Sequence, residues 1–454
     1  MQPPALSPIG LRDFLGGAAA AAAFALLPER WLDQSRRPNL LFILADDLGY
    51  ADVSAFGRPD YRTPNIDRLV GEGVRFTNAY AAASTCTPTR VAFMTGRYPQ
   101  RLEPALQHPM GWSPAGADLP KYGLSPRYPT VASLLRKAGY GTALYGKWHL
   151  GFLPDFGPLR HGFDEFFGIK GGGADYFTHG GPAGQPDLWE GEVPVERVGY
   201  LTDLLSDRAA SYVTKAHDAP FYLSLHYNAP HWPWEGPGDA HGRPAAHSFR
   251  DGGSPAVFRE MMQSLDAGIG RVMAALERSG RAGNTLVIFA SDNGGERYSV
   301  NAPWSNGKFS LSEGGIRVPL ALRWPDRLRA GGTSEQFSIS MDWTATLLAA
   351  AGARADPAYP LDGIDLVPFA RGEKSPTDRT LFWRQPYPEE ASHAAARHGK
   401  WKYLRVGEKE TLFDLSQDPG EKVDLRERAS GEFEKLRAEW QAWNAQMVPM
   451  PVAR

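Results

Sequence analysis

Four short apolar runs, each followed at once by charged, amide or histidine side chains, constrain the fold of this 454-residue chain more than any other feature. They begin the segments NLLFILADD (39–47), TALYGKWH (142–149), PFYLSLHYNAPH (220–231) and TLVIFASDNGG (285–295). Continuous apolar runs of this length are typical of parallel strands in a sheet that helices cover on both faces. We therefore expect four buried parallel strands.

Helical patterns lie between these runs, at residues 66–72, 131–138, 201–216 and 258–279. Strands that alternate with helices predict an α/β fold, with a large, mainly parallel mixed sheet sandwiched between helices. In such sheets, ligands bind beyond the carboxyl ends of the strands. We expect the polar side chains at those ends to meet at one edge of the sheet. They are Asp46, Asp47, Lys147, His149, His231, Asp292 and Asn293.

Two of these strand ends offer hard oxygen ligands. Asp46-Asp47 and Asp292-Asn293 suit Ca²⁺ or Mg²⁺ better than zinc, and the sequence has no cysteine and histidine spacing typical of a zinc site. Taken singly, each pair could also be a polar turn after its strand. Because two such pairs follow two strands, the pattern favours a divalent-cation site.

The sequence pattern changes after about Pro368. The segments TLFWRQ, KWKYLRV and TLFDLSQDP predict antiparallel strands, and a final helix carries one apolar stripe. We therefore divide the chain into a main domain (38–375) and a small C-terminal α+β subdomain of antiparallel strands and one helix (376–454). The stripe consists of Phe433, Leu436, Trp440, Trp443 and Met447.

The first residues are typical of an export signal. Arg12 precedes an alanine-rich apolar run from Leu15 to Leu27, which is too short for a bilayer span of about 20 residues. Ala23 and Ala25 offer a small-x-small cleavage site, although a plain helical or disordered leader is the alternative. We expect a signal peptide and linker at 1–37, an exported, periplasmic or extracellular protein, and no membrane span. A formal net charge of −2 gives no support for a nucleic-acid partner.

Cys86 is the only cysteine, so it cannot form an internal disulfide. One alternative is a small buried hydrophobic residue. A second is a thiolate nucleophile, because Pro88 suits the first position of a helix and a helix N-terminus lowers a thiol pKa. A cysteine phosphatase, however, needs an arginine six positions later, where Ala92 stands. The third alternative is a modified residue.

The third alternative is favoured by a resemblance to a known family. CTPTR (86–90) matches the C-x-P-x-R signature of the formylglycine-dependent (type I) sulfatases, and MTGR follows it. Further similar segments occur in family order from about Pro38 to Leu425: PNLLFILADDLGYADV, TPNIDRLVGEGVRFTNAY, GKWHLG, HGFDEFFG, YNAPHWP, SDNGG, GKFSLSEGGIRVP and LFDLSQDPGE. The chain therefore resembles the arylsulfatase-like group of the alkaline phosphatase superfamily. The resemblance implies an alkaline-phosphatase-like fold, a catalytic domain at 38–375 and a sulfuric ester hydrolase.

The resemblance also implies a chemical role for Cys86. In this family a separate formylglycine-generating enzyme oxidises the cysteine to formylglycine (3-oxoalanine) on the unfolded chain, and the aldehyde hydrates to a gem-diol. One hydroxyl attacks sulfur, and the other helps to expel sulfate afterwards. Thr89 stands at a wildcard position of the motif, so we expect no effect from it.

The remaining roles follow residue by residue from the same resemblance. The cation, Ca²⁺ rather than Mg²⁺, would be held by Asp46, Asp47, Cys86 in its modified form, Asp292 and Asn293. Arg90 would hold the diol, and Lys147 and Lys308 would contact sulfate oxygens. His149 would be the base that collapses the sulfated hemiacetal. His231 would help Lys308 to protonate the leaving alcohol. We expect structural roles for the other histidines considered, which are His108, His161, His179, His217, His241, His247, His393 and His398.

The substrate is less constrained by the sequence. We expect a sulfated carbohydrate, because an exported bacterial enzyme of this group more often meets sulfated polysaccharide fragments. Aromatic side chains in loops near the predicted edge can either stack on sugar faces or line an aryl pocket. Two other functions are considered: a phosphonate or phosphate monoester hydrolase of the same superfamily, and a catalytically silent sulfoglycan-binding homologue. Relative rates on aryl sulfate and aryl phosphate separate the first of these from a sulfatase. The aromatic candidates are Trp112, Tyr176, His179, Trp189, Trp232, Trp234 and Tyr298.

Overall fold

The computed structural model describes residues 37–110, 122–239, 249–386 and 392–450, and residues 38–454 belong to one compact unit. The predicted signal peptide therefore lies outside the described residues, apart from Arg37, as do Trp112, His241 and His247. Within the described ranges, no helix combines the length and apolar character needed to cross a membrane. The predicted boundary between residues 375 and 376 stays a prediction.

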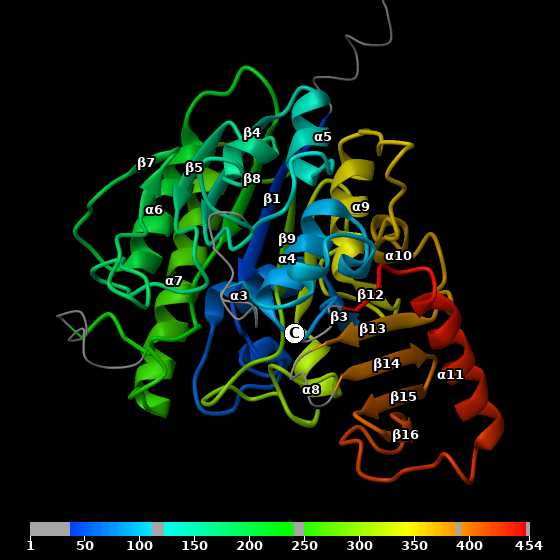
Figure 1. Ribbon diagram of the computed structural model, residues 1–454. Helices are drawn as coiled ribbons and strands as arrows, with labels where there is room; N and C mark the ends of the chain where they lie inside the picture. The colour runs from blue at the N-terminus through cyan, green and yellow to red at the C-terminus, as the bar shows by residue number, and fades with distance from the viewer. Residues whose placement is uncertain (1–36, 111–121, 240–248, 387–391, 451–454) are drawn as a thin grey trace, which may run out of the picture. The chain divides into compact units, whose positions relative to one another are not determined.

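The main sheet has ten strands in the order β11-β2-β10-β9-β1-β8-β4-β5-β6-β7 (Figure 1). The five strands from β9 to β5 are mutually parallel, and antiparallel strands flank them on both sides. This confirms the mainly parallel mixed sheet. The strands are β1 (Asn39–Ala45), β2 (Val74–Phe76), β4 (Gly141–Gly146), β5 (Glu165–Gly168), β6 (Trp189–Glu190), β7 (Val193–Pro194), β8 (Phe221–His226), β9 (Thr285–Ser291), β10 (Leu320–Arg323) and β11 (Gly332–Ser334). A separate two-stranded sheet pairs β3 (Ala79–Tyr80) with β12 (Ser338–Ile339).

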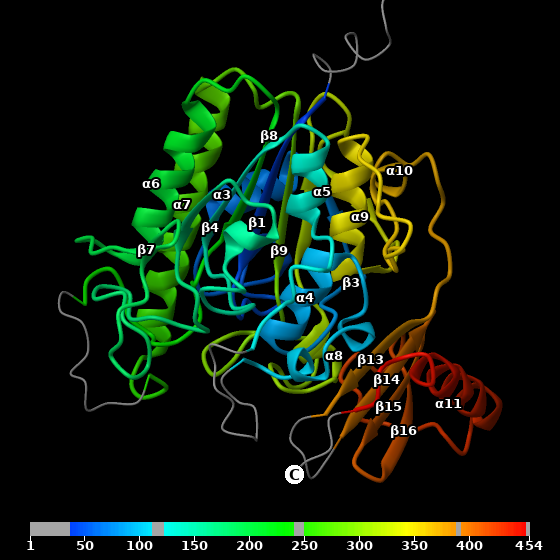
Figure 2. The same ribbon diagram turned by 45° about the horizontal axis from the view of Figure 1, so that its top comes forward.

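Helices cover both faces of this sheet because its strands alternate their apolar side chains between two cores. In β1, Leu41 and Ile43 enter the core under α3 (Pro64–Gly71), α6 (Leu201–Thr214) and α7 (Pro255–Arg278). Leu40 and Phe42 enter the opposite core, under α4 (Cys86–Thr95), α5 (Val131–Lys137) and α9 (Ser340–Ala350). Figure 2 shows the two helical layers on either side of the strands.

The helix that carries the cysteine starts earlier than the sequence pattern indicates. We expected it to begin at Pro88, but α4 begins at Cys86. The first helical turn needs no intrahelical N–H donor, so a proline fits its third position as well as its first. The helix ends at Gly96, which has a positive φ of 66°. Every residue of α4 is buried.

Several shorter helices were not predicted. They are the α-helices α8 (Glu313–Ile316) and α10 (Val367–Ala370), and the 3₁₀ helices η1 (Ser54–Phe56), η2 (Pro99–Arg101), η3 (Pro104–Gln107) and η5 (Pro158–His161).

The C-terminal part is an antiparallel sheet of β13 (Leu381–Gln385), β14 (His393–His398), β15 (Trp401–Val406) and β16 (Lys409–Asp414), with α11 (Ser430–Asn444) on it. Phe433, Leu436, Trp440 and Trp443 form the predicted stripe, while Met447 packs in the same core beyond the helix end. That core also includes side chains of the main domain, among them Tyr80, Ala92 and Met341. The C-terminal sheet therefore shares its core with the main domain.

Candidate active site

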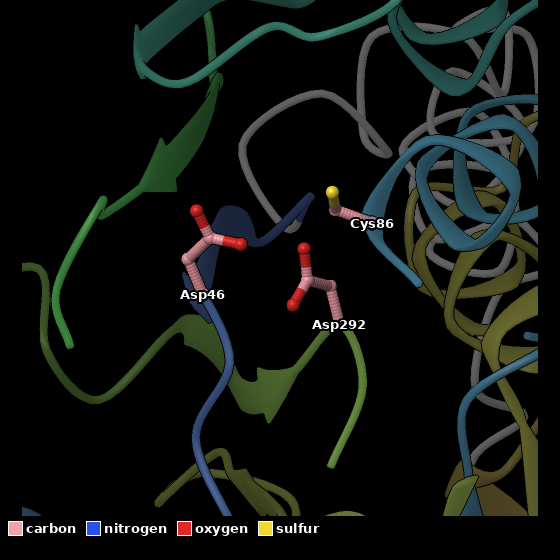
Figure 3. A group of neighbouring side chains, drawn as sticks. All are labelled: Asp46, Cys86 and Asp292. Atoms are coloured by element: carbon pink, nitrogen blue, oxygen red, sulfur yellow. The ribbon is translucent and has the colours of Figure 1, made fainter. Parts of the chain in front are cut away.

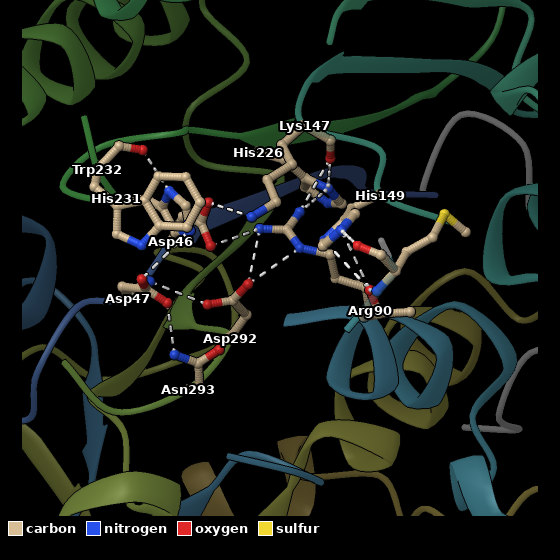
Figure 4. A network of polar contacts seen from close by, with 12 residues as sticks. Asp46, Asp47, Arg90, Lys147, His149, His226, His231, Trp232, Asp292 and Asn293 are labelled. Atoms are coloured by element: carbon tan, nitrogen blue, oxygen red, sulfur yellow. Dashed lines mark hydrogen bonds and ion pairs between the residues drawn. The ribbon is translucent and has the colours of Figure 1, made fainter. Parts of the chain in front are cut away.

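The register of the parallel strands brings the predicted polar residues together. Leu44 of β1 pairs with His226 of β8, and Ala45 pairs with Ser291 of β9, while Gly146 of β4 pairs with His226. The four strands therefore end level with one another. The residues that follow them lie at one edge and form a network of polar contacts (Figure 4).

The two predicted oxygen-ligand pairs bind each other. Asp47 donates its backbone N–H to Asp292 Oδ1 at 3.1 Å, and Asn293 Nδ2 donates to Asp47 Oδ1 at 2.8 Å. Asp47 has a positive φ of 61°, in the left-handed region that aspartate tolerates better than most side chains. These bonds join the ends of β1 and β9.

Cys86 faces these carboxylates from the start of α4. Its sulfur and carboxylate oxygens of Asp46 and Asp292 all lie within 4.8 Å of one another (Figure 3). Burial raises the pKa of the Cys86 thiol, although the charges of Lys147 and Lys308 act in the opposite direction. The thiolate interpretation needed a lowered pKa, so the surroundings of Cys86 count against it.

Three buried cations neutralise the three carboxylates. Lys147 Nζ lies 2.6 Å from Asp46 Oδ2, and Lys308 Nζ lies 2.6 Å from Asp47 Oδ2. Arg90 binds Asp292 through two nitrogens, with a closest distance of 2.9 Å, and also lies 3.5 Å from Asp46. Both lysines and the arginine thus lie beside the predicted cation ligands, and their contacts with the diol and the sulfate stay predictions.

The oxygen donors fit a divalent cation. Asp46 Oδ1 and Asn293 Oδ1 are buried acceptors without a hydrogen-bond donor. Burial raises the pKa of Asp46 well above its usual value; Lys147 opposes this shift, while Asp292 and Asp47 add to it. A cation bound by these oxygens would give the two unpaired acceptors a partner, and it would reduce the repulsion among the carboxylates. Hard oxygen ligands favour Ca²⁺ or Mg²⁺.

The two predicted histidines are held in a neutral state. Burial and the charges of Lys147 and Arg90 lower the pKa of His149 well below its usual value, and burial with Lys308 does the same for His231. His231 Nδ1 lies 2.6 Å from the carbonyl of Trp232, which can only accept, so Nδ1 carries the proton. The Nε2 atom of His231, 3.6 Å from Asp47, is then an acceptor.

His226, which the sequence analysis missed, supports Arg90 from beneath. Its Nδ1 atom lies 3.1 Å from the Lys147 carbonyl and 3.3 Å from the Arg90 guanidinium, and Nε2 lies 2.8 Å from Ser224 Oγ. Burial, with the charge of Arg90, lowers its pKa to about 3. The sequence feature that could have identified His226 is its position as the last residue of an apolar strand.

A pocket of about 400 Å³ opens over these groups. Cys86, His149, His231 and Lys308 line it at one end, and its walls include Met110, Trp232 and Phe309. Gly172 and Gly173 also line it: a Cβ on Gly172 would lie 2.8 Å from His149 Nε2, and one on Gly173 would lie 3.2 Å from His231 Cε1. These glycines leave room for the two histidine rings.

Of the predicted aromatic candidates, Trp232 lines this pocket. Tyr176 is fully buried and donates to the carbonyl of His231 at 2.9 Å, so it supports the histidine from behind. Trp234 and Tyr298 pack edge to face against each other, and His179 Nε2 lies 3.0 Å from the Gly199 carbonyl. Trp189 packs against the ammonium of Lys170.

The histidines that we expected to be structural do not line the pocket where the structure describes them. His161 packs on Trp148, and His217 packs against Tyr212. His393 and His398 lie in β14, and buried His108 follows η3.

Comparisons with known proteins match these features. The Sulfatase family model matches residues 38–353, and the model described as N-sulphoglucosamine sulphohydrolase, C-terminal, matches residues 304–442. Arylsulfatase A of Homo sapiens is 34% identical over 444 residues, which covers 86% of this chain and 84% of that protein. N-acetylgalactosamine-6-sulfatase of Mus musculus is 32% identical over 383 residues, which covers 76% of this chain and 68% of that protein. The solved structure of Ps i-CgsB in complex with k-i-k-neocarrahexaose is 31% identical, with a TM-score of 0.82 and coverage of 92% and 94%.

Proposed function

The chain belongs to the sulfatase family of sulfuric ester hydrolases, with the expected alkaline-phosphatase-like fold, and we propose that it cleaves sulfate from a sulfated carbohydrate with a formylglycine made from Cys86. One observation carries the proposal. The single cysteine lies against Asp46 and Asp292 at the end of a pocket that also exposes Lys308 and two neutral histidines.

The modified residue and the cation supply the chemistry that the unmodified chain lacks. A hydrated aldehyde at position 86 supplies a nucleophilic hydroxyl and a second hydroxyl through which sulfate can leave. A cation held by Asp46, Asp47, Asp292 and Asn293 supplies positive charge to a sulfate oxygen. The family resemblance favours Ca²⁺, while the oxygen ligands by themselves fit Mg²⁺ as well.

The side chains around position 86 would bind and orient the sulfate. Lys147 and Lys308 present fixed positive charges, which stabilise the negative charge of a sulfate ester in a buried site. Arg90 holds Asp292 and lies beside Asp46, so it would fix the carboxylates as well as position 86. His149, held neutral, is suited to accept a proton from position 86.

Lys308 and His231 would act together on the leaving oxygen. Both line the pocket with Cys86, and both lie near Asp47 Oδ2, with Lys308 Nζ 2.6 Å and His231 Nε2 3.6 Å from it. Because they share this position, we assign protonation of the leaving oxygen to Lys308 with the help of His231, as the family resemblance implies.

The carbohydrate assignment rests on the pocket wall and on the relatives. Trp232 and Phe309 offer apolar faces beside the lysine, as a sugar ring requires, and Gln185 adds a hydrogen-bonding side chain. The name of one relative specifies a sulfated amino sugar, and one similar structure contains a neocarrahexaose. The leader pattern at 1–37 supports an exported protein, and CTPTR supports maturation by a formylglycine-generating enzyme.

The test combines mass spectrometry with kinetics on the protein made together with a formylglycine-generating enzyme. We expect the tryptic peptide that contains residue 86 to show the aldehyde mass, and we expect release of sulfate from an aryl sulfate to exceed release of phosphate from the matching aryl phosphate. Cys86→Ser should abolish turnover while the melting temperature changes little. Near-normal turnover by Cys86→Ser would exclude the formylglycine mechanism. A faster phosphate release would favour a phosphomonoesterase, and binding of sulfoglycans without turnover by modified protein would favour a silent homologue.

A further inference from the structure

Gln385, the last residue of β13, joins the C-terminal sheet to two segments of the main domain that lead to residues lining the active-site pocket. It is 4% exposed and lies 299 positions after Cys86 in the chain. Its side chain binds two segments of the main domain. One leads into Cys86, and the other carries Lys308.

The contacts form a closed ring of hydrogen bonds. Ser84 Oγ donates to Gln385 Oε1, and Gln385 Nε2 donates to the carbonyl of Phe309 at 2.9 Å. The Phe309 N–H in turn donates to the carbonyl of Ser84 at 3.0 Å. Ser84 lies two residues before Cys86, and Phe309 directly follows Lys308. One amide side chain therefore joins the segment of the nucleophile to the segment of the lysine.

The turn at Lys308 contains a residue with an unfavourable backbone conformation. Phe309 has a φ of 72°, in the left-handed region that is unfavourable for a bulky side chain. A conformation of this kind persists where its surroundings fix it. The amide of Gln385 binds the carbonyl of this strained residue, one peptide away from the lysine whose ammonium must meet the substrate.

Other contacts hold β13 in place without Gln385. Trp383 Nε1 donates to the carbonyl of Ala81 at 2.8 Å, and Gln100 Nε2 donates to the carbonyl of Arg384 at 2.9 Å. The shared apolar core adds to these bonds. Replacement of the Gln385 side chain should therefore leave the C-terminal sheet attached to the main domain.

We propose that Gln385 is a positioning residue for the hydrolysis, which sets the place of Lys308 relative to residue 86. The inference rests on the proposed function, in which Lys308 protonates the leaving oxygen. A merely structural glutamine would satisfy a buried carbonyl and contribute to stability alone. A positioning glutamine affects the step that needs Lys308, so its removal costs most for substrates with poor leaving groups.

The kinetic test uses Gln385→Met, which keeps the length of the side chain and removes both hydrogen bonds. Rates are measured on aryl sulfates whose phenols have increasing pKa, and they are normalised to the formylglycine content found by mass spectrometry. We expect kcat to fall about 10- to 100-fold with little change in KM, because small displacements of a catalytic group have effects of this size. The loss should grow as the phenol pKa rises. A loss that is equal for all phenols, or no loss, would overturn the proposal.

Two matched variants separate an effect on the position of Lys308 from an effect on the stability of the protein. Thr411→Val removes a bond of 3.0 Å to the Leu404 carbonyl within the same sheet, away from the pocket. It should lower the melting temperature comparably and leave kcat within about twofold. Gln385→Glu keeps an acceptor for Ser84 but has no donor for Phe309 when ionised, so it should behave like Gln385→Met. Full activity of Gln385→Glu would contradict a role in holding the Lys308 turn.

A crystal structure of Gln385→Met tests the inference independently of turnover. We expect Phe309 to leave the left-handed region, or Lys308 Nζ to move from its position 2.6 Å from Asp47 Oδ2. An unchanged turn at 308–309 would refute the positioning role even if the wild-type protein proved inactive on sulfate esters. Absence of sulfate release by the modified wild type would count against the proposed function, and the structure would still decide the inference.

Discussion

Two of the buried clusters of charged side chains among the described residues differ in how their carboxylates are neutralised. The active-site cluster lies at the edge of the main sheet, below the pocket. The second, which we name the interdomain cluster, joins the main domain to the C-terminal sheet. The active-site cluster contains Asp46, Asp47, Arg90, Lys147, Asp292 and Lys308, and the interdomain cluster contains Glu313, Arg317, Arg397, Lys402 and Glu421.

In the interdomain cluster, cations surround one central carboxylate. Arg317 lies 3.0 Å from Glu313, Lys402 lies 3.0 Å from it, and Arg397 lies 3.4 Å from it. Burial would raise the pKa of Glu313, but Lys402, Arg397 and Arg317 bring it below its usual value. The protein's own cations are therefore sufficient for Glu313 to stay ionised.

In the active site, equal burial has the opposite outcome for Asp46, whereas for Asp292 the charges of Arg90 and Lys147 outweigh burial and bring the pKa below its usual value. The pKa of Asp46 is raised although Lys147 lies 2.6 Å away, because burial opposes its charge and two further aspartates lie beside it. The comparison shows that burial alone does not distinguish a structural cluster from a functional one. The ratio of charges does so: the active-site cluster has three carboxylates for three cations, whereas the interdomain cluster has two carboxylates for three cations, so the active site is the poorer of the two in positive charge.

The largest loss of stability should come from a substitution in the interdomain cluster. Glu313→Gln leaves three buried cations without their central carboxylate, so we expect a loss of about 3–5 kcal/mol in the free energy of unfolding. Turnover per folded molecule should be retained at low temperature. Denaturant unfolding and kcat measurements check both parts. Glu434→Gln, which removes an exposed pair with Arg437 on α11, is the control and should cost less than about 1 kcal/mol.

Asp46→Asn should have the opposite effects, with a large loss of turnover and a small loss of stability. Removal of a proposed cation ligand should lower kcat about 10²- to 10³-fold, because the charge that stabilises the reacting sulfate is lost. Stability without added cation should fall much less than in Glu313→Gln, since folding already disfavours the ionised form of Asp46. Kinetics and thermal melts in chelator provide the two readouts. Equal destabilisation by the two variants would break the distinction between the clusters.

Removal of the cation should separate the two clusters further. A ligand present at 100 times its dissociation constant stabilises a folded protein by about 2.7 kcal/mol, so excess chelator should lower both the melting temperature and the activity of the wild type. Glu313→Gln should keep this response because its active site is intact. Asp46→Asn should lose most of it. A wild-type melting curve that is the same with and without chelator would argue against a bound metal.

The smallest effect concerns pH. Because the pKa of Asp46 is raised, protons bind the folded, ion-free site more readily than the unfolded chain, and they compete with the cation as pH falls through that pKa. The apparent cation affinity should decrease about tenfold for each pH unit below it. The pKa of Glu313 is lowered, so its contribution persists down to about its usual pKa of 4.5 and is lost only below it. Calcium titrations and unfolding curves from pH 7 to pH 4 test the two directions.

The sequence predicted the parts of the site that follow long apolar strands. The runs before Asp46, Lys147, His231 and Asp292 are all buried strands, and parallel pairing places their ends at one edge without further information. The short strands β2, β10 and β11 were not predicted, since three or four residues carry no periodic signal. The roles of the site residues remain predictions.

Residues that act through distant contacts could not be found in the same way. His226 is the last residue of the apolar strand β8, and such a histidine is usually structural. Gln385 belongs to a strand whose pairing partners are its C-terminal neighbours, and nothing local indicates that its amide reaches Ser84. The raised pKa of Asp46 also depends on the burial of its side chain, so it is a property of the folded chain alone.

The complete burial of α4 has a consequence for how the active protein is made. Under the proposed mechanism, the chain must meet its modifying enzyme before Cys86 is enclosed, because in the folded state that residue is 4% exposed at the start of a helix without any exposed position. The fraction of active molecules then depends on the relative rates of two competing processes. One is oxidation of Cys86 in the unfolded chain, and the other is folding of the domain around Cys86. A slower-folding variant would give a larger active fraction, and a faster-folding one would produce more well-folded, inert protein.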